Sequence, residues 1–323
     1  MKSNLFPILL YATVMTLSAM QEGKGQDYRK YNKQTIEAEK LISEEKFLQA
    51  LATYDQLFQN YDFIFLRDFK IAAQLSLYLT KKDKCLDLIK RGINAGWELK
   101  NIKKNDYLKN HLKKTDWKII KQSYPGLHST YLAGLEYTLR EKVQRMFKED
   151  QKKALGALVK VGNKAQEKYA VNKFAPHSEI QISKLIEILE EYGYPGEMLI
   201  GNNFWMSTIL SHHNSISKDY NSYDTAFNFI KPKLIHAIDL GRMSPYEYAL
   251  IDDWQKAVSS GGTVAGYGFL TSVHQSTLVE TDQLRRLIGL RSIELRNKLV
   301  DIEMKTGMDF YLPGWIEGKI NVN

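Results

Sequence analysis

The stretch that decides the fold is Phe47-Leu-Gln-Ala-Leu-Ala-Thr-Tyr-Asp-Gln-Leu57. Its aromatic, small and apolar residues recur at spacings of three or four, at Phe47, Ala50, Tyr54 and Leu57. This spacing places them on one stripe of a helix. Because the stripe includes a residue as small as Ala50, it predicts a helix that packs closely against a partner helix.

A related stretch follows about one helical hairpin later. Cys85 stands thirty-five residues after Ala50 and is followed by further apolar residues at Leu86, Leu88, Ile89 and Ile93. A repeat of this length is typical of stacked helical hairpins. In this register Cys85 takes a small apolar position, so we expect a thiol that packs in a core rather than reacts. Gly96 is expected to adopt the left-handed conformation that ends the hairpin, with Trp97 folding back.

Further motifs extend this pattern into a family resemblance. Gly96-Trp97 is followed by Asp106-Tyr107-Leu108 and then by Asp116-Trp117. On these residues the segment 33–122 resembles the tetratricopeptide repeat family, more closely the tetratricopeptide-like segments of exported bacterial proteins. Two departures are Lys82, which stands where the first repeat has Phe47, and Glu44 or Glu45 in place of the usual Gly. The resemblance implies two hairpins with a groove for a protein or peptide partner. Because about three repeats are needed to stand alone, we expect this half to pack on the rest of the chain.

Helix signals are also dense after residue 126. Ser178-x-x-Gln181 predicts a capping box at the start of a helix that ends at Gly193. Ser244-Pro245-x-Glu247 predicts a second helix start, with Pro at the first helical position. Other helices are expected near 204–215, over 223–240 with a kink or break at Pro232, and after 277 with an interruption at Gly289. Strand-like sequence is confined to 261–271, as a small hairpin or an ordered loop.

Composition supports the same fold class. The chain has 323 residues, of which 44% are hydrophobic, with only 7 Pro and 20 Gly. These numbers leave long uninterrupted windows for helices and enough apolar residues for two cores. We therefore predict an all-α protein with tetratricopeptide-like hairpins over 27–125, a multi-helix domain with at most a small β-hairpin over 126–310, and a C-terminal tail over 311–323.

The first 26 residues predict export. Lys2 precedes an uncharged run from Leu5 to Met20, which is a signal-peptide pattern. The run is shorter than the roughly 20 apolar residues that span a bilayer, so cleavage is expected rather than a permanent anchor. We therefore expect a periplasmic or secreted protein without a membrane span. Cys85 is the single cysteine, so no intrachain disulfide forms.

Basic residues are concentrated in one segment. The chain carries a formal charge of +8, and residues 80–122 hold thirteen Lys and Arg against five Asp and Glu. Such a segment could contact an anionic surface through counterion release, or it could be the solvated face of several helices, which we favour. No nucleic-acid partner is expected, because no base-reading motif is present.

The order of motifs over 140–300 supports a second resemblance. The motifs are Glu191-Tyr-Gly-Tyr-Pro-Gly196 with Ile200-Gly201, then His212, Tyr248-Ala-Leu-Ile-Asp252, Tyr267-Gly268 and Leu284-Arg-Arg-Leu-Ile-Gly-Leu290. In this order they resemble an uncharacterised bacterial family known as domain of unknown function 6624. The family tends to have Gln, Arg and Thr-Gln where this chain has Ser211, Asp253 and Phe269-Leu270. The resemblance implies architecture and candidate positions, and these departures mean that a family site could be altered here.

Two candidate sites follow. His212 and Asp252 are the best pair for acid–base chemistry, because a carboxylate that orients an imidazole holds a base near neutral pH. The alternative for His212 is a hydrogen-bonded residue at the edge of the core. A possible pocket is lined by aromatic side chains, with core packing as the alternative: Trp205, Tyr246, Tyr248, Trp254 and Tyr267. No metal or cofactor is expected, since no ligand spacing or nucleotide motif is present.

Two functions remain open from the sequence. The first is a binding or scaffold protein of the cell envelope that uses its helical repeats to hold a protein or peptide. The alternative is a hydrolase-like enzyme that uses His212 with Asp252. The second hypothesis requires the two side chains to face one cleft.

Overall fold

The fold is built from helices throughout the part of the chain that is described. The computed structural model describes residues 26–312 and 318–323, so the predicted leader over 1–26 lies outside the described residues except for Gln26. Within the described ranges no strand is formed, and Val273 and Val322 make an isolated bridge. The all-α prediction is confirmed.

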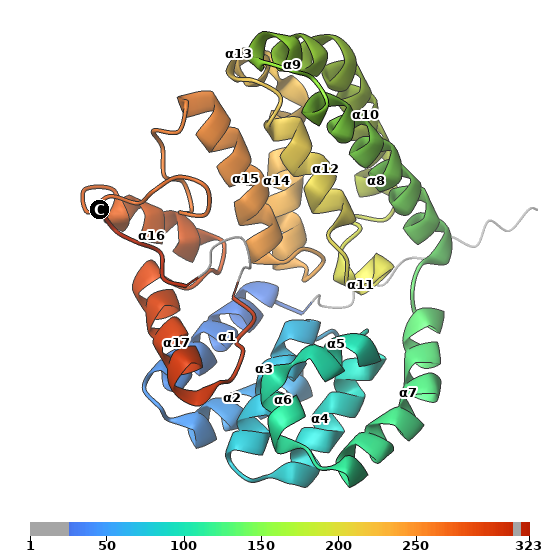
Figure 1. The fold of residues 1–323 in the computed structure, drawn as a ribbon, viewed down its shortest axis with the longest axis vertical. Helices are drawn as coiled ribbons and strands as arrows, with labels where there is room; N and C mark the ends of the chain where they lie inside the picture. Colours follow the sequence, from blue (N-terminus) through green and yellow to red (C-terminus); the bar gives the residue numbers. More distant parts are fainter. Residues whose placement is uncertain (1–25, 313–317) are drawn as a thin grey trace, which may run out of the picture.

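Two helical hairpins form the front half, which is the lower lobe in Figure 1. Helix α1 packs against α2, and α3 packs against α4, before two short helices and a long α7 follow. The bounds are Tyr28–Ser43 (α1), Phe47–Asn60 (α2), Leu66–Tyr78 (α3), Lys82–Asn94 (α4), Leu99–Lys104 (α5), Asp106–His111 (α6) and Lys114–Ala133 (α7).

The predicted stripe is the core of these hairpins. Ala50 and Tyr54 on α2 and Cys85 on α4 are each 0% exposed. Burial raises the pKa of the Cys85 thiol to about 12, so Cys85 packs as a small apolar residue. Gly96 has φ +95° and the Trp97 amide donates to the Gly92 carbonyl at 2.8 Å, which closes the second hairpin as predicted.

The front core is completed by the end of the chain. Helix α17 (Ile293–Thr306) packs on α1, and Leu299, Ile302 and Phe310 belong to the same buried cluster as the hairpins. Helix α17, from the C-terminal part of the chain, therefore completes the packing of the two hairpins.

The predicted domain boundary at Pro125 does not coincide with a break in the helices. Helix α7 runs without a break through Pro125.

The back half is a bundle around a second core, seen as the upper lobe in Figure 1. Helix α12 packs against both α8 and α15, which places it inside the bundle. The bounds are Tyr137–Leu158 (α8), Asn163–Tyr169 (α9), Ala170–Phe174 (a π-helical turn), Ala175–Glu191 (α10), Glu197–Ile200 (α11), Trp205–Asn214 (α12), Lys218–Tyr223 (α13), Thr225–Asp239 (α14), Pro245–Ser260 (α15) and Leu278–Leu287 (α16).

Two predicted helix starts have different outcomes. The capping box of Ser244 and Glu247 is present at the start of α15. Ser178, in contrast, lies inside α10, which begins at Ala175, so the predicted capping box there is wrong. The Ser178 hydroxyl is hydrogen-bonded to His213 at 2.8 Å, a tertiary contact that sequence spacing could not reveal. Pro232 lies inside a continuous α14.

The segment 261–271 is an ordered loop. Asp253 on α15 accepts the amides of Tyr267 at 2.6 Å and Phe269 at 2.8 Å. The last residue of the predicted C-terminal tail is held by two backbone hydrogen bonds. The Gln275 amide donates to the Asn323 carbonyl and the Asn323 amide donates to the Val273 carbonyl, both at 2.9 Å. No helix in the described ranges is long and apolar enough to cross a membrane.

The basic segment 80–122 covers the outside of the front half. Eleven of its thirteen Lys and Arg side chains are exposed, and Lys84 and Lys90 are half-buried. The predicted solvated helix faces are therefore observed.

Candidate functional site

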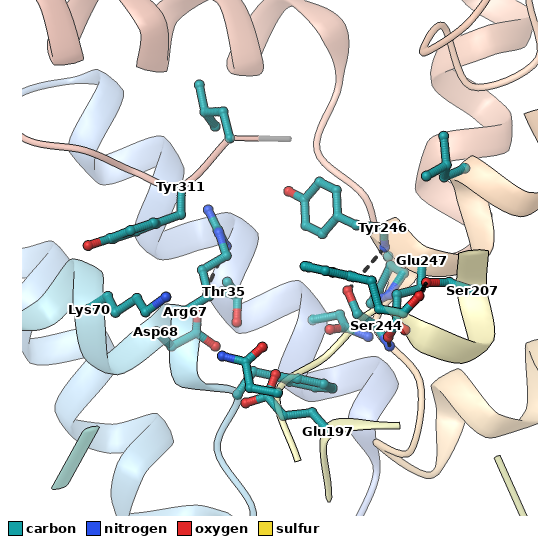
Figure 2. A pocket seen from close by; sticks show the side chains of 18 of the residues that line it. Thr35, Arg67, Asp68, Lys70, Glu197, Ser207, Ser244, Tyr246, Glu247 and Tyr311 are labelled. Carbon is teal, nitrogen blue, oxygen red and sulfur yellow. Dashed lines mark hydrogen bonds and ion pairs between the residues drawn. The ribbon is translucent and has the colours of Figure 1, made fainter. Parts of the chain in front are cut away.

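A cavity of about 880 Å³ lies between the two halves (Figure 2). Helices α1, α3 and α5 of the front half line one side of it, whereas α11, α12 and α15 of the back half line the other. Residues 309–312, which follow α17, close part of the rim. Helices α1, α3 and α5 thus face the back half across this cavity.

Helical spacing explains which side chains reach the cavity. On α15 the lining residues are Tyr246, Glu247, Leu250 and Trp254, which share one face. On α12 the lining residues are Ser207, Thr208, Ser211 and His212, again one face. Each helix therefore has one face toward the cavity and another in the back core.

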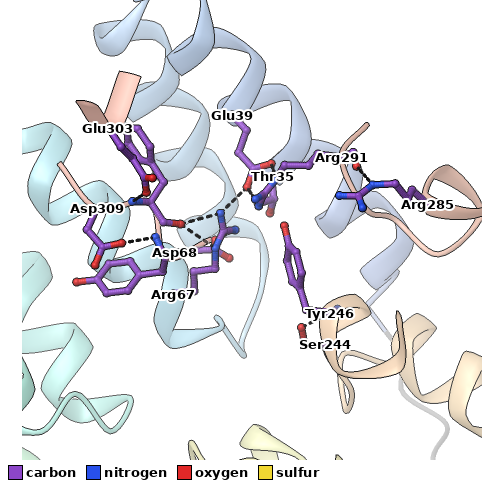
Figure 3. A network of polar contacts seen from close by, with 12 residues as sticks. Thr35, Glu39, Arg67, Asp68, Ser244, Tyr246, Arg285, Arg291, Glu303 and Asp309 are labelled. Carbon is purple, nitrogen blue, oxygen red and sulfur yellow. Dashed lines mark hydrogen bonds and ion pairs between the residues drawn. The ribbon is translucent and has the colours of Figure 1, made fainter. Parts of the chain in front are cut away.

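One wall of the cavity is an ion-pair cluster that joins the halves (Figure 3). Glu39 on α1 is 1% exposed and receives Arg67 Nη2 at 2.7 Å and Arg291 Nε at 2.5 Å. Burial alone would raise the pKa of Glu39, but the charges of Arg291 and Arg67 outweigh it and lower this pKa. Glu39 is therefore a carboxylate that both halves share.

The resemblance motif Leu284–Leu290 supports this cluster. Arg285 is 0% exposed and donates to the carbonyls of Arg291 and Tyr267, both at 2.6 Å. Burial lowers the pKa of Arg285 to about 10. Arg285 thereby fixes the backbone that presents Arg291 to Glu39.

Two further lining residues complete the paired wall. The Tyr246 ring lies under the guanidinium groups of Arg291 at 5.0 Å and Arg67 at 5.7 Å. Asp68 accepts the Tyr31 hydroxyl at 2.5 Å and lies 3.7 Å from Arg67 Nη1. Burial nevertheless raises the pKa of Asp68 to about 6.

Two carboxyls on the opposite wall have no cationic partner. Glu197 Oε1 accepts the Leu66 amide at 2.7 Å across the interface between the halves, and Glu247 accepts the Tyr194 hydroxyl and the Ser244 amide at 3.3 Å each. Burial raises the pKa of Glu197 to about 8 and that of Glu247 to about 7. Within the described ranges neither carboxyl forms an ion pair, so both are proton carriers near neutral pH.

Lys70 brings an unpaired positive charge to the same space. Its ammonium lies 4.6 Å from the centre of the Tyr311 ring and forms no ion pair with any residue of the described ranges. Burial lowers the pKa of Lys70, and the negative charges of Glu197 and Asp309 act against this shift. Lys70 is thus close to Glu197 without neutralising it.

His212 lines the cavity, but its carboxylate is not the predicted one. His212 Nδ1 lies 2.6 Å from Oδ2 of Asp150, which is 0% exposed, and the imidazole is 31% exposed. The second ring nitrogen of His212 has no hydrogen-bond partner among the described residues. This geometry suits an oriented imidazole that presents one nitrogen to a ligand.

Asp252 belongs to a different cluster. It lies 2.6 Å from the Lys231 ammonium and is also paired with Lys256. Asp252 is two residues from both Leu250 and Trp254, which line the cavity, and so it projects from the opposite face of α15. The structure does not bring His212 and Asp252 together.

His213, the neighbour of His212, has a structural environment. It is 0% exposed and lies 2.8 Å from both the Ser178 hydroxyl and the Asp224 carboxylate. Asp224 also accepts the amides of Ala226 and Phe227 as the cap of α14. These residues resemble a Ser-His-Asp set in composition, but none of them lines the cavity, and together they join α10, α12 and α14.

Of the aromatic residues predicted to line a pocket, Trp254 and Tyr246 line the cavity. Tyr248 and Tyr267 are 1% and 3% exposed in the back core, and Trp205 packs against that core beneath the Arg140 guanidinium. The packing alternative therefore applies to three of the five. No group of three or more potential metal ligands is found among the described residues.

Several cavity residues were missed at the sequence level. Glu197 directly follows the motif that ends at Gly196, and Glu247 was identified as a helix cap without a site role. Glu39, Arg67 and Lys70 carry no local signal, because their neighbours across the cavity lie far away in the sequence. Comparison with protein-family models, curated proteins and solved structures gives no match.

Proposed function

We propose that this protein is a binding protein that holds a small organic molecule in the cavity between its halves. The observation that carries the proposal is a cavity of about 880 Å³ whose walls combine aromatic rings with the ionisable groups of Lys70, Glu197 and Glu247, which form no ion pair within the described part of the chain. Cavities of this size, with a few convergent polar groups, are typical of sites for small ligands.

The position of the cavity supports a small ligand over a folded partner. The resemblance to tetratricopeptide repeats implies a groove for a protein or peptide, and helices α1, α3 and α5 line the cavity on that side. Because the back half covers these helices, the remaining space suits a compact molecule. Closure around the ligand would involve both halves, which contribute Lys70 and Glu197 respectively.

A thermal-shift screen tests the proposal. The panel contains amines, carboxylates, zwitterions, sugars and nucleosides, and we expect at least one class to raise the melting temperature. Leu250→Trp fills the cavity from α15 and should abolish the shift. Leu155→Trp, at an exposed position on α8, is the matched control and should keep it. A shift that persists in Leu250→Trp, or a panel without any stabilising compound, contradicts the proposal.

The leader pattern over 1–26 extends the proposal to the cell envelope. We expect the mature chain to begin near residue 26 and to be found in the periplasm or medium. Intact-mass measurement of the protein from fractionated bacterial cells that express it checks this. A full-length chain that stays in the cytoplasm contradicts it.

A second candidate function is hydrolase-like acid–base chemistry at His212. The observation that favours it is the hydrogen bond of 2.6 Å between His212 and buried Asp150, with the imidazole lining the cavity. His212→Asn keeps a donor toward Asp150 and removes the other ring nitrogen. We expect this variant to lose hydrolysis of small activated esters while it melts close to wild type. Equal rates in the two proteins would end this candidate.

A further inference from the structure

We propose that Glu197 and Glu247 form a subsite for the ammonium group of a primary amine ligand. This inference rests on the proposed function and names the chemical class of the ligand. Both carboxyls line the cavity from the back half, Glu197 from α11 and Glu247 from α15 (Figure 2).

The first argument is the charge balance of the cavity walls. Glu39 is paired with both Arg67 and Arg291, and Arg67 also lies 3.7 Å from Asp68, so this wall already supplies carboxyl groups to both of its guanidinium groups. Among the residues that the structure describes, Glu197 and Glu247 receive hydrogen bonds from neutral groups alone: a backbone amide in the case of Glu197, and Ser244, Tyr194 and Ser207 in the case of Glu247. A carboxylate that is removed from water without a cation is costly, and a ligand cation would offset this cost.

A second, independent observation is a pair of buried oxygen atoms that form no hydrogen bond within the described part of the chain. Ser211 is 6% exposed, lines the cavity, and has a hydroxyl with no hydrogen-bond partner. It lies one helical turn after Ser207, which contacts Glu247. Asp68 Oδ1, on a residue that is 2% exposed, lies 3.7 Å from Arg67 Nη1 and forms no hydrogen bond among the described residues. An ammonium group has three N–H donors, and these atoms are acceptors.

Lys70 does not fill this subsite. Its ammonium lies over the Tyr311 ring and makes no ion pair among the described residues. Its charge still opposes a second cation nearby, so the cavity favours a monoamine over a polyamine. Tyr246, Trp254 and Phe65 line the cavity and provide surface for an aromatic or aliphatic ligand body.

The protonation of the carboxyls makes amine binding depend on pH. Burial raises the pKa of Glu197 to about 8 and that of Glu247 to about 7. An ammonium group binds the ionised carboxylates, so binding at lower pH must release protons. The apparent affinity for an amine should therefore rise as the pH increases from 6 to 8.

Isothermal titration calorimetry with tyramine and tyrosol tests the inference. Both compounds carry a phenol ring on an ethyl chain, which ends in an amine in tyramine and in a hydroxyl in tyrosol. We expect tyramine to bind at least tenfold more tightly than tyrosol at pH 8. At pH 7, buffers with different ionisation enthalpies should reveal proton release with tyramine alone.

Two variants complete the test. Glu197→Gln keeps an acceptor for the Leu66 amide and should weaken tyramine binding at least tenfold, with a smaller proton release that comes from Glu247 alone. Glu280→Gln, at an exposed position on α16, should bind like wild type. Two results would overturn this inference and leave the proposed function standing, provided that some compounds bind in the cavity. The first is that wild type binds tyrosol as tightly as tyramine. The second is that Glu197→Gln binds tyramine as tightly as wild type does. If ligands bind Leu250→Trp as well as they bind wild type, they do not bind in the cavity, and the proposed function itself fails.

Discussion

The two walls of the cavity differ in how their carboxyl groups are paired. On one wall Glu39 is shared by Arg67 and Arg291, and its carboxylate is held in the ionised form. On the other wall Glu197 and Glu247 form no ion pair with any described residue, and burial raises their pKa values toward neutrality. The adjacent residues His213 and His212 show a similar contrast. Both ring nitrogens of His213 are hydrogen-bonded, whereas His212 has a hydrogen bond at Nδ1 alone among the described residues. The difference separates groups that hold the fold together from groups that are available to a ligand.

The largest effect is expected from Glu39→Gln. It leaves buried Arg291 without a carboxylate and removes the nearer of the two carboxyl groups beside Arg67, which should lower the free energy of unfolding by about 3 to 5 kcal/mol. Urea denaturation at pH 7 measures this. Glu45→Gln, which removes an exposed ion pair with Lys305, is the control and should change little. If Glu39→Gln lowers the free energy of unfolding by less than about 1 kcal/mol, the ion pairs of this wall do not stabilise the fold, and the two walls do not differ in the way described.

His213→Phe is expected to have the next largest effect. It leaves the buried Ser178 hydroxyl and the Asp224 carboxylate without their shared partner, at a cost of about 2 to 3 kcal/mol. The same denaturation experiment checks this, with exposed His274→Phe as the control. Wild-type stability in His213→Phe would mean that the buried bonds do not join the helices.

Glu197→Gln should stabilise the empty protein at high pH. A carboxyl whose pKa is raised on folding, here from 4.5 to about 8, costs stability as the pH rises through that interval. The variant should therefore be more stable than wild type at pH 8, by about 1 to 2 kcal/mol, because cavity water reaches the half-buried group and reduces the effect. The gain should shrink as the pH falls and vanish below pH 4.5. A difference that does not depend on pH contradicts the unpaired state of Glu197.

The smallest effect is expected from Lys70→Met. Loss of the contact with the Tyr311 ring costs about 0.5 to 1 kcal/mol. Removal of a desolvated ammonium offsets part of this cost, so the net change in unfolding free energy should stay below about 1 kcal/mol. The variant should instead raise the pKa of Glu197 further, because the charge of Lys70 lowers it. A large loss of stability would show that Lys70 has a structural partner.

The sequence predicted the helices better than the site. The stripe around Ala50, the repeat at Cys85 and the cap at Ser244 depend on neighbours within a few residues or on a simple period, so they could be recognised. The cap at Ser178 was misassigned because its hydroxyl bonds a histidine thirty-five residues away.

The site depends on contacts of longer range. His212 was identified, but its partner Asp150 is sixty-two residues away in the sequence and was not. Asp252 looked equally suitable by residue type, and only the direction of its side chain on α15 separates it from the cavity. The ion pair of Glu39 with Arg291 spans 252 residues, so no local pattern could indicate it.

The most direct test of the unpaired wall is a carbon-13 NMR titration of the glutamate carboxyl groups, with Glu197 assigned from the spectrum of Glu197→Gln. The structure predicts that Glu197 titrates near pH 8 in the empty protein, because it is half-buried and forms no ion pair with any residue that the structure describes. Titration of Glu197 near 4.5 would contradict the account, since the carboxyl would then be hydrated or paired within the protein.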